Sequence, residues 1–278
     1  MKSISFGQYY PAESIIHKLD PRTKVILTSL YIVCSFICKS VLSFVALIFL
    51  SIGIVLASRI PLKTVLRSIR PIIFIMVFMS LINIFLTKEG ILIFELWRIS
   101  IYSKGIYAAA SAVVRVISLI IGTSIFLTYT TTPIELTDGI EQLFGPLKKI
   151  KIPVHEFAMM MTIALRFIPT LIEETDKIIA AQKARGADFS NGSLIKRAKA
   201  LIPILVPLFI SAFRRADELA IAMECRCYRG GDGRTKMHVL KYRAVDFVLI
   251  GAFILVLCGL IAMNYFGIDF PFIKAGWF

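Results

Sequence analysis

The sequence lacks the residue patterns that nucleotide, metal and catalytic sites need. It contains no Gly-Lys pair, which excludes the P-loop pattern G-x-x-x-x-G-K-[ST]. Its three histidines, His17, His155 and His238, are scattered, and no Ser/His/Asp or paired-carboxylate spacing stands out. Cys225-Arg226-Cys227 lacks the two-residue spacer that is typical of zinc sites. We therefore expect no catalytic residue, no metal site and no cofactor bound by this chain.

Charged residues are also scarce. They make up 18% of the 278 residues, against 57% hydrophobic residues, and a soluble domain of this size would carry more charge. Several apolar runs approach the ~20 residues that a helix needs to cross a hydrocarbon core. These runs are continuous rather than alternating, which disfavours a β-barrel. The composition predicts an all-α, polytopic membrane protein embedded in a lipid bilayer.

The net charge of +14 has two explanations. In a soluble protein it would suggest a nucleic-acid partner. In a membrane protein, Lys and Arg accumulate in cytoplasmic segments, and this accounts for most of the excess. We therefore expect no nucleic-acid partner. The alternative, a basic membrane anchor for nucleic acid or anionic lipid, is supported only by the net charge. The five cysteines do not resemble a disulfide framework, because three of them lie in apolar runs.

Five apolar runs are expected to cross the membrane. They are Val25–Cys38, Val41–Ala57, Pro71–Leu86, Gly105–Tyr129 and Val245–Phe266. Asp20 followed by Pro21 predicts the N-cap and first position of the first helix. The Lys and Arg distribution predicts a cytoplasmic N-terminus and an external C-terminus. Residues 87–104, with Lys88, Glu89, Trp97 and Arg98, are expected to form an external loop.

Two groups of cations lie in or between these spans. Residues 58–70 carry Arg59, Lys63, Arg67 and Arg70, spaced three or four apart, so a helix would present them on one face. The simple interpretation is a cytoplasmic connector beside anionic lipid headgroups. Arg115 lies inside the fourth span, where a charge is usually paired or faces a polar cavity. The sequence does not name its partner.

The sequence between the fourth and fifth spans is amphipathic. Thr132-Pro133-Ile134-Glu135 is a capping box that predicts a short helix over about 133–143. Two long helices are expected at 155–187 and 201–230, and their apolar first halves could dip into the membrane. We divide the chain into membrane helices (1–130), a cytoplasmic or interfacial region of coupling helices (131–243) and a last membrane helix (244–278).

Each long helix ends near an arginine with small neighbours, Ala184-Arg185-Gly186 and Cys225-Arg226-Cys227. A cation at a helix C-terminus is favourable by ~0.3–1 kcal/mol, and Gly186 suits the left-handed position after a helix. These effects alone could explain both endings. Alternatively, each end enters a groove on a partner, where the planar guanidinium bonds two acceptors at once.

Small and flexible side chains along the same two helices are candidate packing residues. They are Met159, Met160, Ala212, Ala216, Ala220 and Met223. Alanines repeating every four residues let another helix approach closely, and methionines can repack against more than one partner. The simpler explanation is that the two long helices pack on each other.

Several motifs fall in a recognisable order along nearly the whole chain. They are Leu19-Asp20-Pro21-Arg22-Thr23-Lys24, Thr132-Pro133-Ile134-Glu135-Leu136, Ala164-Leu165-Arg166-Phe167-Ile168-Pro169 and the two arginine motifs. With this set the chain resembles the T component, the transmembrane coupling subunit, of energy-coupling factor (ECF) transporters. These are ABC-type importers of vitamins and transition-metal ions in prokaryotic plasma membranes.

The resemblance implies that two ABC ATPases, which bind ATP and magnesium, dock on the motifs around Arg185 and Arg226. It also implies that the long helices hold a membrane-embedded S component, which captures the substrate. The second motif departs from the family pattern, because Cys225 and Cys227 replace the small neighbours. The main alternative is an ordinary ABC importer permease that binds its own substrate, for which a single ATPase-docking loop is expected.

Overall fold

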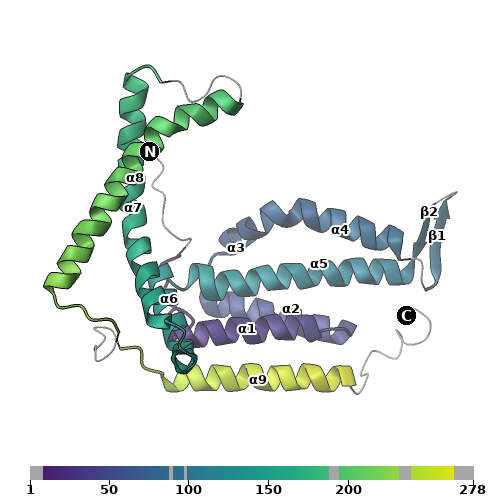
Figure 1. Ribbon diagram of the computed structural model, residues 1–278. Coiled ribbons are helices and arrows are strands. Elements are labelled where there is room, and N and C mark those ends of the chain that lie inside the picture. Colours follow the sequence, from purple (N-terminus) through teal and green to yellow (C-terminus); the bar gives the residue numbers. More distant parts are fainter. Residues whose placement is uncertain (1–8, 88–89, 97–98, 188–193, 232–238, 266–278) are drawn as a thin grey trace. The chain divides into compact units, whose positions relative to one another are not determined.

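The computed structural model describes residues 9–87, 90–96, 99–187, 194–231 and 239–265, and this part of the chain is almost entirely helical (Figure 1). The α-helices are α1 Pro21–Ile37, α2 Val41–Ser58, α3 Leu62–Ile69, α4 Ile73–Leu86, α5 Ser103–Thr123, α6 Pro133–Leu143, α7 Val154–Ala184, α8 Leu194–Cys225 and α9 Ala244–Tyr265. The π-helical segment η2, Ser124–Tyr129, extends α5, and the 3₁₀ segments are η1, Arg70–Ile72, and η3, Gly145–Ile150. The predicted all-α, polytopic membrane fold is confirmed.

Five helical stretches in the described chain are long and apolar enough to cross a membrane. They are Val41–Ser58, Leu62–Leu86, Ser103–Tyr129, Val154–Ala184 and Ala244–Tyr265. The number agrees with the sequence prediction, but one member differs. α7 qualifies, whereas α1, with 17 residues, is at the lower limit of the ~17–25 residues that a span needs.

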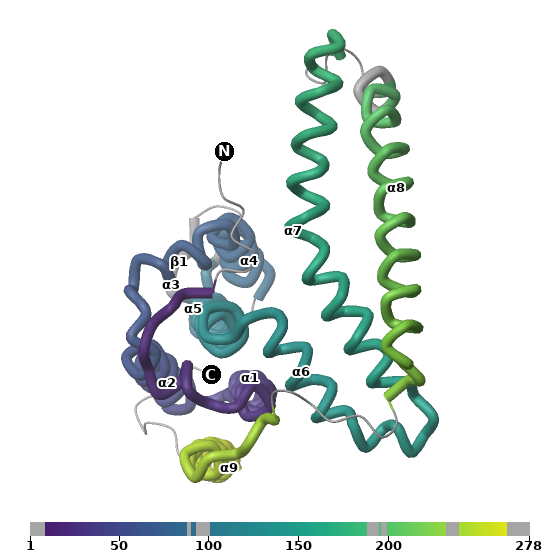
Figure 2. Tube along the Cα trace, turned by 90° about the vertical axis from the view of Figure 1, so that its left-hand side faces the viewer, coloured from purple at the N-terminus to yellow at the C-terminus, as the bar shows by residue number. Residues whose placement is uncertain are grey.

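The chain separates into two compact units, one comprising residues 1–142 and 239–278 and the other residues 143–238. In the first unit, α5 packs against α1, α2, α3 and α4, and α9 packs against α1 (Figure 1). In the second unit, α7 and α8 lie side by side and run antiparallel (Figure 2). The division of the chain by side of the membrane stays a prediction.

The predicted helix starts at Asp20 and Thr132 are confirmed. The Arg22 backbone N–H donates to Asp20 Oδ1 at 2.9 Å. At α6, the Thr132 N–H donates to Glu135 Oε2 at 3.1 Å, and the Glu135 N–H donates to Thr132 Oγ1 at 3.3 Å. This reciprocal pair is the capping box, and α6 has the predicted bounds. Both signals are local in sequence, which is why they could be recognised without a structure.

Arg115 has a partner that the sequence did not reveal. Its Nη2 donates to the Cys38 carbonyl at 2.9 Å, and its guanidinium carbon lies 5.5 Å from the centre of the Phe44 ring. Cys38 is the C-cap of α1, so the arginine places a positive charge at the negative end of that helix. Arg115 is therefore paired within the bundle, as a charge on a membrane helix should be.

The expected external loop at 87–104 contains an antiparallel hairpin, with β1 Leu92–Leu96 paired to β2 Ile99–Tyr102. Isoleucine, phenylalanine and tyrosine favour strands, and several of them lie between the charged residues of this segment. Lys88, Glu89, Trp97 and Arg98 lie outside the described residues.

Tyr31 forms the buried centre of the membrane bundle. Its hydroxyl donates to the Ser118 carbonyl at 2.9 Å and is hydrogen-bonded to Ser51 Oγ at 2.7 Å. Its ring lies against Gly122, where an added Cβ would be 2.2 Å from a ring carbon. The absence of a side chain at Gly122 therefore lets α1 and α5 approach each other closely.

We expect Gly122→Ala to lower the free energy of unfolding by ~1–3 kcal/mol, because the methyl group overlaps the Tyr31 ring. Gly53→Ala in α2 is the matched control, because nothing lies within 4 Å of an added Cβ there. In a helix interior the control change should be neutral or stabilising by up to ~1 kcal/mol. Thermal unfolding in detergent measures both variants, and equal midpoints would contradict this packing.

Candidate functional site

The C-terminus of α7 is closed by a Schellman motif. The Gly186 N–H donates to the Lys183 carbonyl at 3.0 Å, and the Ala187 N–H donates to the Gln182 carbonyl at 3.0 Å. Gly186 has φ of 84°, the left-handed conformation that this motif requires. Arg185 is the C-cap, immediately before the left-handed residue, and is exposed.

The C-terminus of α8 has the same hydrogen-bond pattern. The Cys227 N–H donates to the Glu224 carbonyl at 2.8 Å, and the Tyr228 N–H donates to the Met223 carbonyl at 3.0 Å. Cys227 is the left-handed residue, with φ of 56°. Arg226 therefore occupies the position that Arg185 occupies on α7, and it is also exposed. The repetition seen in the sequence corresponds to a repeated backbone geometry.

The two endings differ in backbone strain. Glycine adopts left-handed φ freely, whereas a residue with a Cβ pays ~1–2 kcal/mol in that conformation. The left-handed residue therefore destabilises the α8 end, whereas Gly186 causes no such strain at the α7 end. Nothing in the structure explains why cysteine rather than glycine stands at position 227.

Cys227→Gly should therefore raise the free energy of unfolding by ~1 kcal/mol, because it removes strain at a left-handed position. Cys225→Gly is the matched control. Cys225 is the last residue of α8, and the same chemical change there should be destabilising by up to ~1 kcal/mol. Chemical denaturation of both variants in detergent provides the comparison. If both variants changed the free energy of unfolding in the same direction, Cys227 would not be the strained, left-handed residue of the cap.

The two arginine ends lie far apart because α7 and α8 are antiparallel. Arg215 Nη2 pairs with Glu174 Oε2 at 2.9 Å near the middle of the pair. Gln182 Nε2 reaches the Pro203 carbonyl at 3.5 Å, an acceptor that Pro207 leaves without a helical donor. At 31 residues, α7 is ~46 Å long, so Arg185 and Arg226 mark opposite ends of the helix pair (Figure 2).

The guanidinium groups at both ends are available to a partner. Among the described residues, no acidic side chain forms an ion pair with either Arg185 or Arg226. Ala184 and Cys225, which precede the two arginines, are exposed as well. In the part of the chain that the structure describes, no group of three or more His, Cys, Asp or Glu residues could hold a metal ion.

The alanine stripe lies beside the contact between α7 and α8. The more buried face of α8 repeats every three or four residues and comprises Ile204, Leu208, Ser211, Arg215, Leu219 and Met223. Ala212 is half-buried next to this face, whereas Ala216 and Ala220 are exposed. On α7, Met159 is half-buried and Met160 is exposed. Three of the candidate packing residues therefore remain accessible to a further helix.

Sequence reasoning missed a broad apolar surface on the outer face of α8. Its members are exposed and comprise Ile202, Leu205, Val206, Phe209, Ile210 and Phe213. The Phe209 and Phe213 rings stack with their centres 6.4 Å apart. The available signal was the spacing of these apolar residues, three or four positions apart, which places them on one face of a helix. Contiguous exposed apolar surface of this kind indicates a contact with lipid or another protein.

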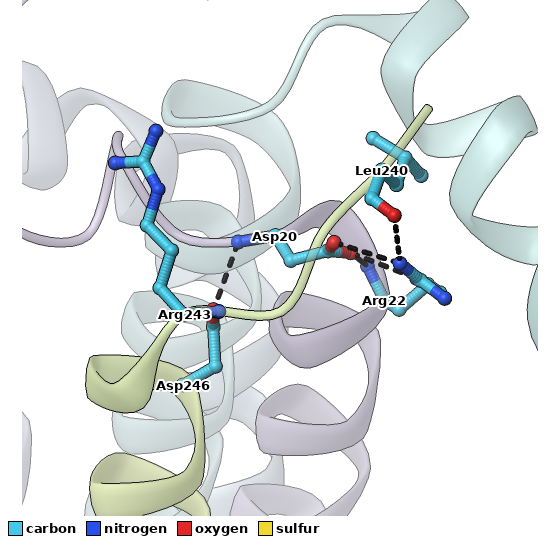
Figure 3. A network of polar contacts seen from close by, with 5 residues as sticks. All are labelled: Asp20, Arg22, Leu240, Arg243 and Asp246. Atoms are coloured by element: carbon cyan, nitrogen blue, oxygen red, sulfur yellow. Dashed lines mark hydrogen bonds and ion pairs between the residues drawn. The ribbon is translucent and has the colours of Figure 1, made fainter. Parts of the chain in front are cut away.

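A polar network also missed from the sequence joins the starts of α1 and α9 (Figure 3). Asp246 is fully buried and accepts hydrogen bonds from the Asp20 N–H at 3.1 Å and the Arg243 N–H at 2.7 Å. Arg22 pairs with Asp20 at 3.0 Å and donates to the Leu240 carbonyl at 2.9 Å. The network fixes the segment that enters α9 from the long helices. An acidic residue in the first turn of an apolar span was the available signal.

Known proteins resemble this chain over most of its length. The family described as "Cobalt transport protein" matches residues 12–239. A protein named "Energy-coupling factor transporter transmembrane protein EcfT" from Ruminiclostridium cellulolyticum is 52% identical over 265 residues, 95% of this chain and 98% of the relative. Proteins of the same name from Clostridium kluyveri and Bacillus subtilis are 49% and 48% identical, covering 96% and 90% of this chain and 99% and 94% of the relatives. The chain therefore belongs to the family of T components, the transmembrane proteins of energy-coupling factor transporters.

Proposed function

We propose that the chain is the coupling subunit of an ECF-type ABC importer. In this role it transmits the ATP-driven motion of two ABC ATPases to a membrane-embedded S component, which binds a vitamin or similar micronutrient. The observation that carries the proposal is the pair of equivalent arginine caps at opposite ends of one antiparallel helix pair. Two separated and geometrically matched ends suit two partners of the same kind.

The cap geometry supports docking at both ends. Each arginine is presented from a helix terminus that two backbone hydrogen bonds hold in place, so its Cα position is defined before a partner arrives. A guanidinium entering an acidic groove can form two parallel hydrogen bonds, which fix its direction as well as its position. ATP and magnesium belong to the ATPases in this proposal, and this chain is a non-catalytic subunit that binds no cofactor.

The outer face of α8 supports contact with the S component. Phe209, Ile210 and Phe213 offer exposed apolar surface, and Ala216 and Ala220 continue along the same helix toward Arg226. A transmembrane helix of a partner can pack closely against small residues and fill the gaps beside larger ones. When ATP closes the ATPases, their docking grooves approach each other, and the arginine-tipped helix ends move with these grooves. The paired helices then tilt the S component and expose its site to the cytoplasm.

The charge distribution supports the proposed orientation. Lys148, Lys149 and Lys151 precede α7, and the N-terminal segment carries Arg22 and Lys24. Cations gather on the cytoplasmic side, so we place the N-terminus and the long helices there, at the plasma membrane of a prokaryote. The relatives described above come from bacteria, which is consistent with this location.

Purification of the tagged chain from its host in mild detergent tests the proposal. We expect two ABC ATPase subunits and one small hydrophobic protein to co-elute, identified by mass spectrometry. The labelled micronutrient should bind the small protein and not the chain alone. If the chain binds substrate alone and no such protein co-elutes, it is an ordinary permease.

A further inference from the structure

An apolar groove opens on the side of the membrane bundle between α2, α3 and α5. Its volume is about 510 Å³, and its walls include Ile48, Leu56, Leu62, Leu66, Val114 and Ile121. The Ser51 hydroxyl also reaches this wall, but its oxygen already lies within hydrogen-bonding distance of the Leu47 carbonyl and of the Tyr31 hydroxyl, at 2.7 Å in both cases. The groove therefore offers its occupant almost entirely apolar contacts.

The length of the groove along α2 is close to the thickness of one leaflet of a bilayer. Along α2 its wall runs from Ile48 to Leu56, which is ~12 Å at 1.5 Å per residue. α3 lies at the end where α2 finishes and contributes Leu62, Val65, Leu66 and Ile69 to the lining. A partner helix that crosses the membrane would need a groove along most of the ~30 Å core. An acyl chain from a single leaflet spans only about half of that length, ~15 Å, which is close to the length of this wall.

The groove has a positively charged rim on α3. At ~100° per residue, Lys63 and Arg67 lie on the helix beside Leu62 and Leu66, and Arg70 continues this face. All three cations are exposed. α2, α3 and α5 contain no Asp or Glu, so no carboxylate on these elements competes for the cations.

The orientation of α3 is fixed by hydrogen bonds to η2 and by packing against the bundle. Tyr129 of η2 donates to the Thr64 carbonyl at 3.2 Å, and its hydroxyl is hydrogen-bonded to the Ser68 hydroxyl. Val65 and Ile69 are buried against the bundle. The cations are thus held next to the groove by this packing and by the hydrogen bonds to Tyr129.

We propose that this groove binds one anionic phospholipid. An acyl chain lies between α2 and α5, and the headgroup phosphate receives charge-assisted hydrogen bonds from Lys63, Arg67 and Arg70. The site lies in the membrane unit and does not depend on the arginine caps. It can therefore stand or fail separately from the proposed coupling function.

Native mass spectrometry of the full-length chain in mild detergent tests this site, with phosphatidylglycerol and phosphatidylcholine of identical acyl chains supplied in equal amounts. We expect one phosphatidylglycerol per chain, preferred by about tenfold or more, because each cation near an anionic headgroup contributes ~1 kcal/mol. The variant Lys63→Gln/Arg67→Gln/Arg70→Gln should lose this preference. Lys148→Gln/Lys149→Gln/Lys151→Gln removes the same charge elsewhere and should retain it.

A groove variant and a soluble competitor separate lipid binding from simple anion binding. Ile52→Trp fills the groove from an exposed position of α2 and should reduce bound phosphatidylglycerol while leaving the cations in place. Excess glycerol 3-phosphate should not displace the lipid. Equal adducts of the two lipids, preference retained after neutralisation of α3, or displacement by glycerol 3-phosphate would each overturn the proposal.

Discussion

Arg185→Ala and Arg226→Ala are each expected to remove one ATPase from the purified complex, and the double variant should remove both. Breaking a buried, hydrogen-bonded charge pair from one side costs ~3–5 kcal/mol, which lowers affinity on the order of a hundredfold or more. ATP-driven uptake should fall in both single variants, because a closing motion that acts on one helix end cannot tilt the pair. Quantitative mass spectrometry of ATPase per chain is the measurement.

Conservative and neighbouring variants separate docking from helix capping. Arg185→Lys keeps the positive charge at the C-terminus of α7 but loses the planar fork, so it should restore stability without restoring full ATPase binding. Lys183→Ala and Arg229→Ala remove exposed cations close to the two caps and should leave binding nearly unchanged. Unchanged complex yield and uptake in both alanine variants would show that the arginines serve only the helix ends.

Asp246→Ala is expected to lower the free energy of unfolding of the membrane unit by ~2–6 kcal/mol. The fully buried carboxylate accepts from two backbone N–H groups, and each would be left unsatisfied at ~1–3 kcal/mol. Asp246→Asn keeps one acceptor oxygen and should be less damaging. Thermal unfolding in detergent provides the readout.

Asp217→Ala is the matched control for this network. It removes the same charge from an exposed position of α8, where surface substitutions usually change stability by no more than ~0.5 kcal/mol. If Asp246→Ala and the control had equal thermal unfolding midpoints, the network would contribute little to the stability of the membrane unit. A large loss with normal ATPase binding by the remaining folded chain would assign Asp246 to the membrane unit alone.

Local signals in the sequence predicted local structure well. The Asp20 and Thr132 caps depend on hydrogen bonds two or three residues apart, and both are present. Hydropathy predicted the polytopic membrane fold, because a span must bury about twenty apolar residues wherever it packs. Hydropathy was less successful in deciding which helices qualify as spans. α1 is short, and α7 combines an apolar first half with a charged second half.

Contacts between distant residues could not be predicted in the same way. Asp246 bonds the backbone of Asp20 across 226 positions, and Arg115 bonds Cys38 across 77. No periodicity encodes such pairs. The left-handed conformation of Cys227 could not be predicted for a different reason, because residues other than glycine rarely adopt positive φ.

The exposed cysteines beside Arg226 allow the most direct test of the docking claim. Cys225 and Cys227 are free and exposed in the chain, as is Cys258 of α9. The rate of maleimide labelling can be followed for each thiol by peptide mass spectrometry, in the isolated chain and in the ATPase-containing complex. We predict that Cys225 and Cys227, and a cysteine placed by Ala184→Cys, become strongly protected in the complex, while the Arg226→Ala variant stays reactive at Cys225 and Cys227. Labelling of these thiols at the same rate with and without the ATPases would contradict docking at the arginine ends.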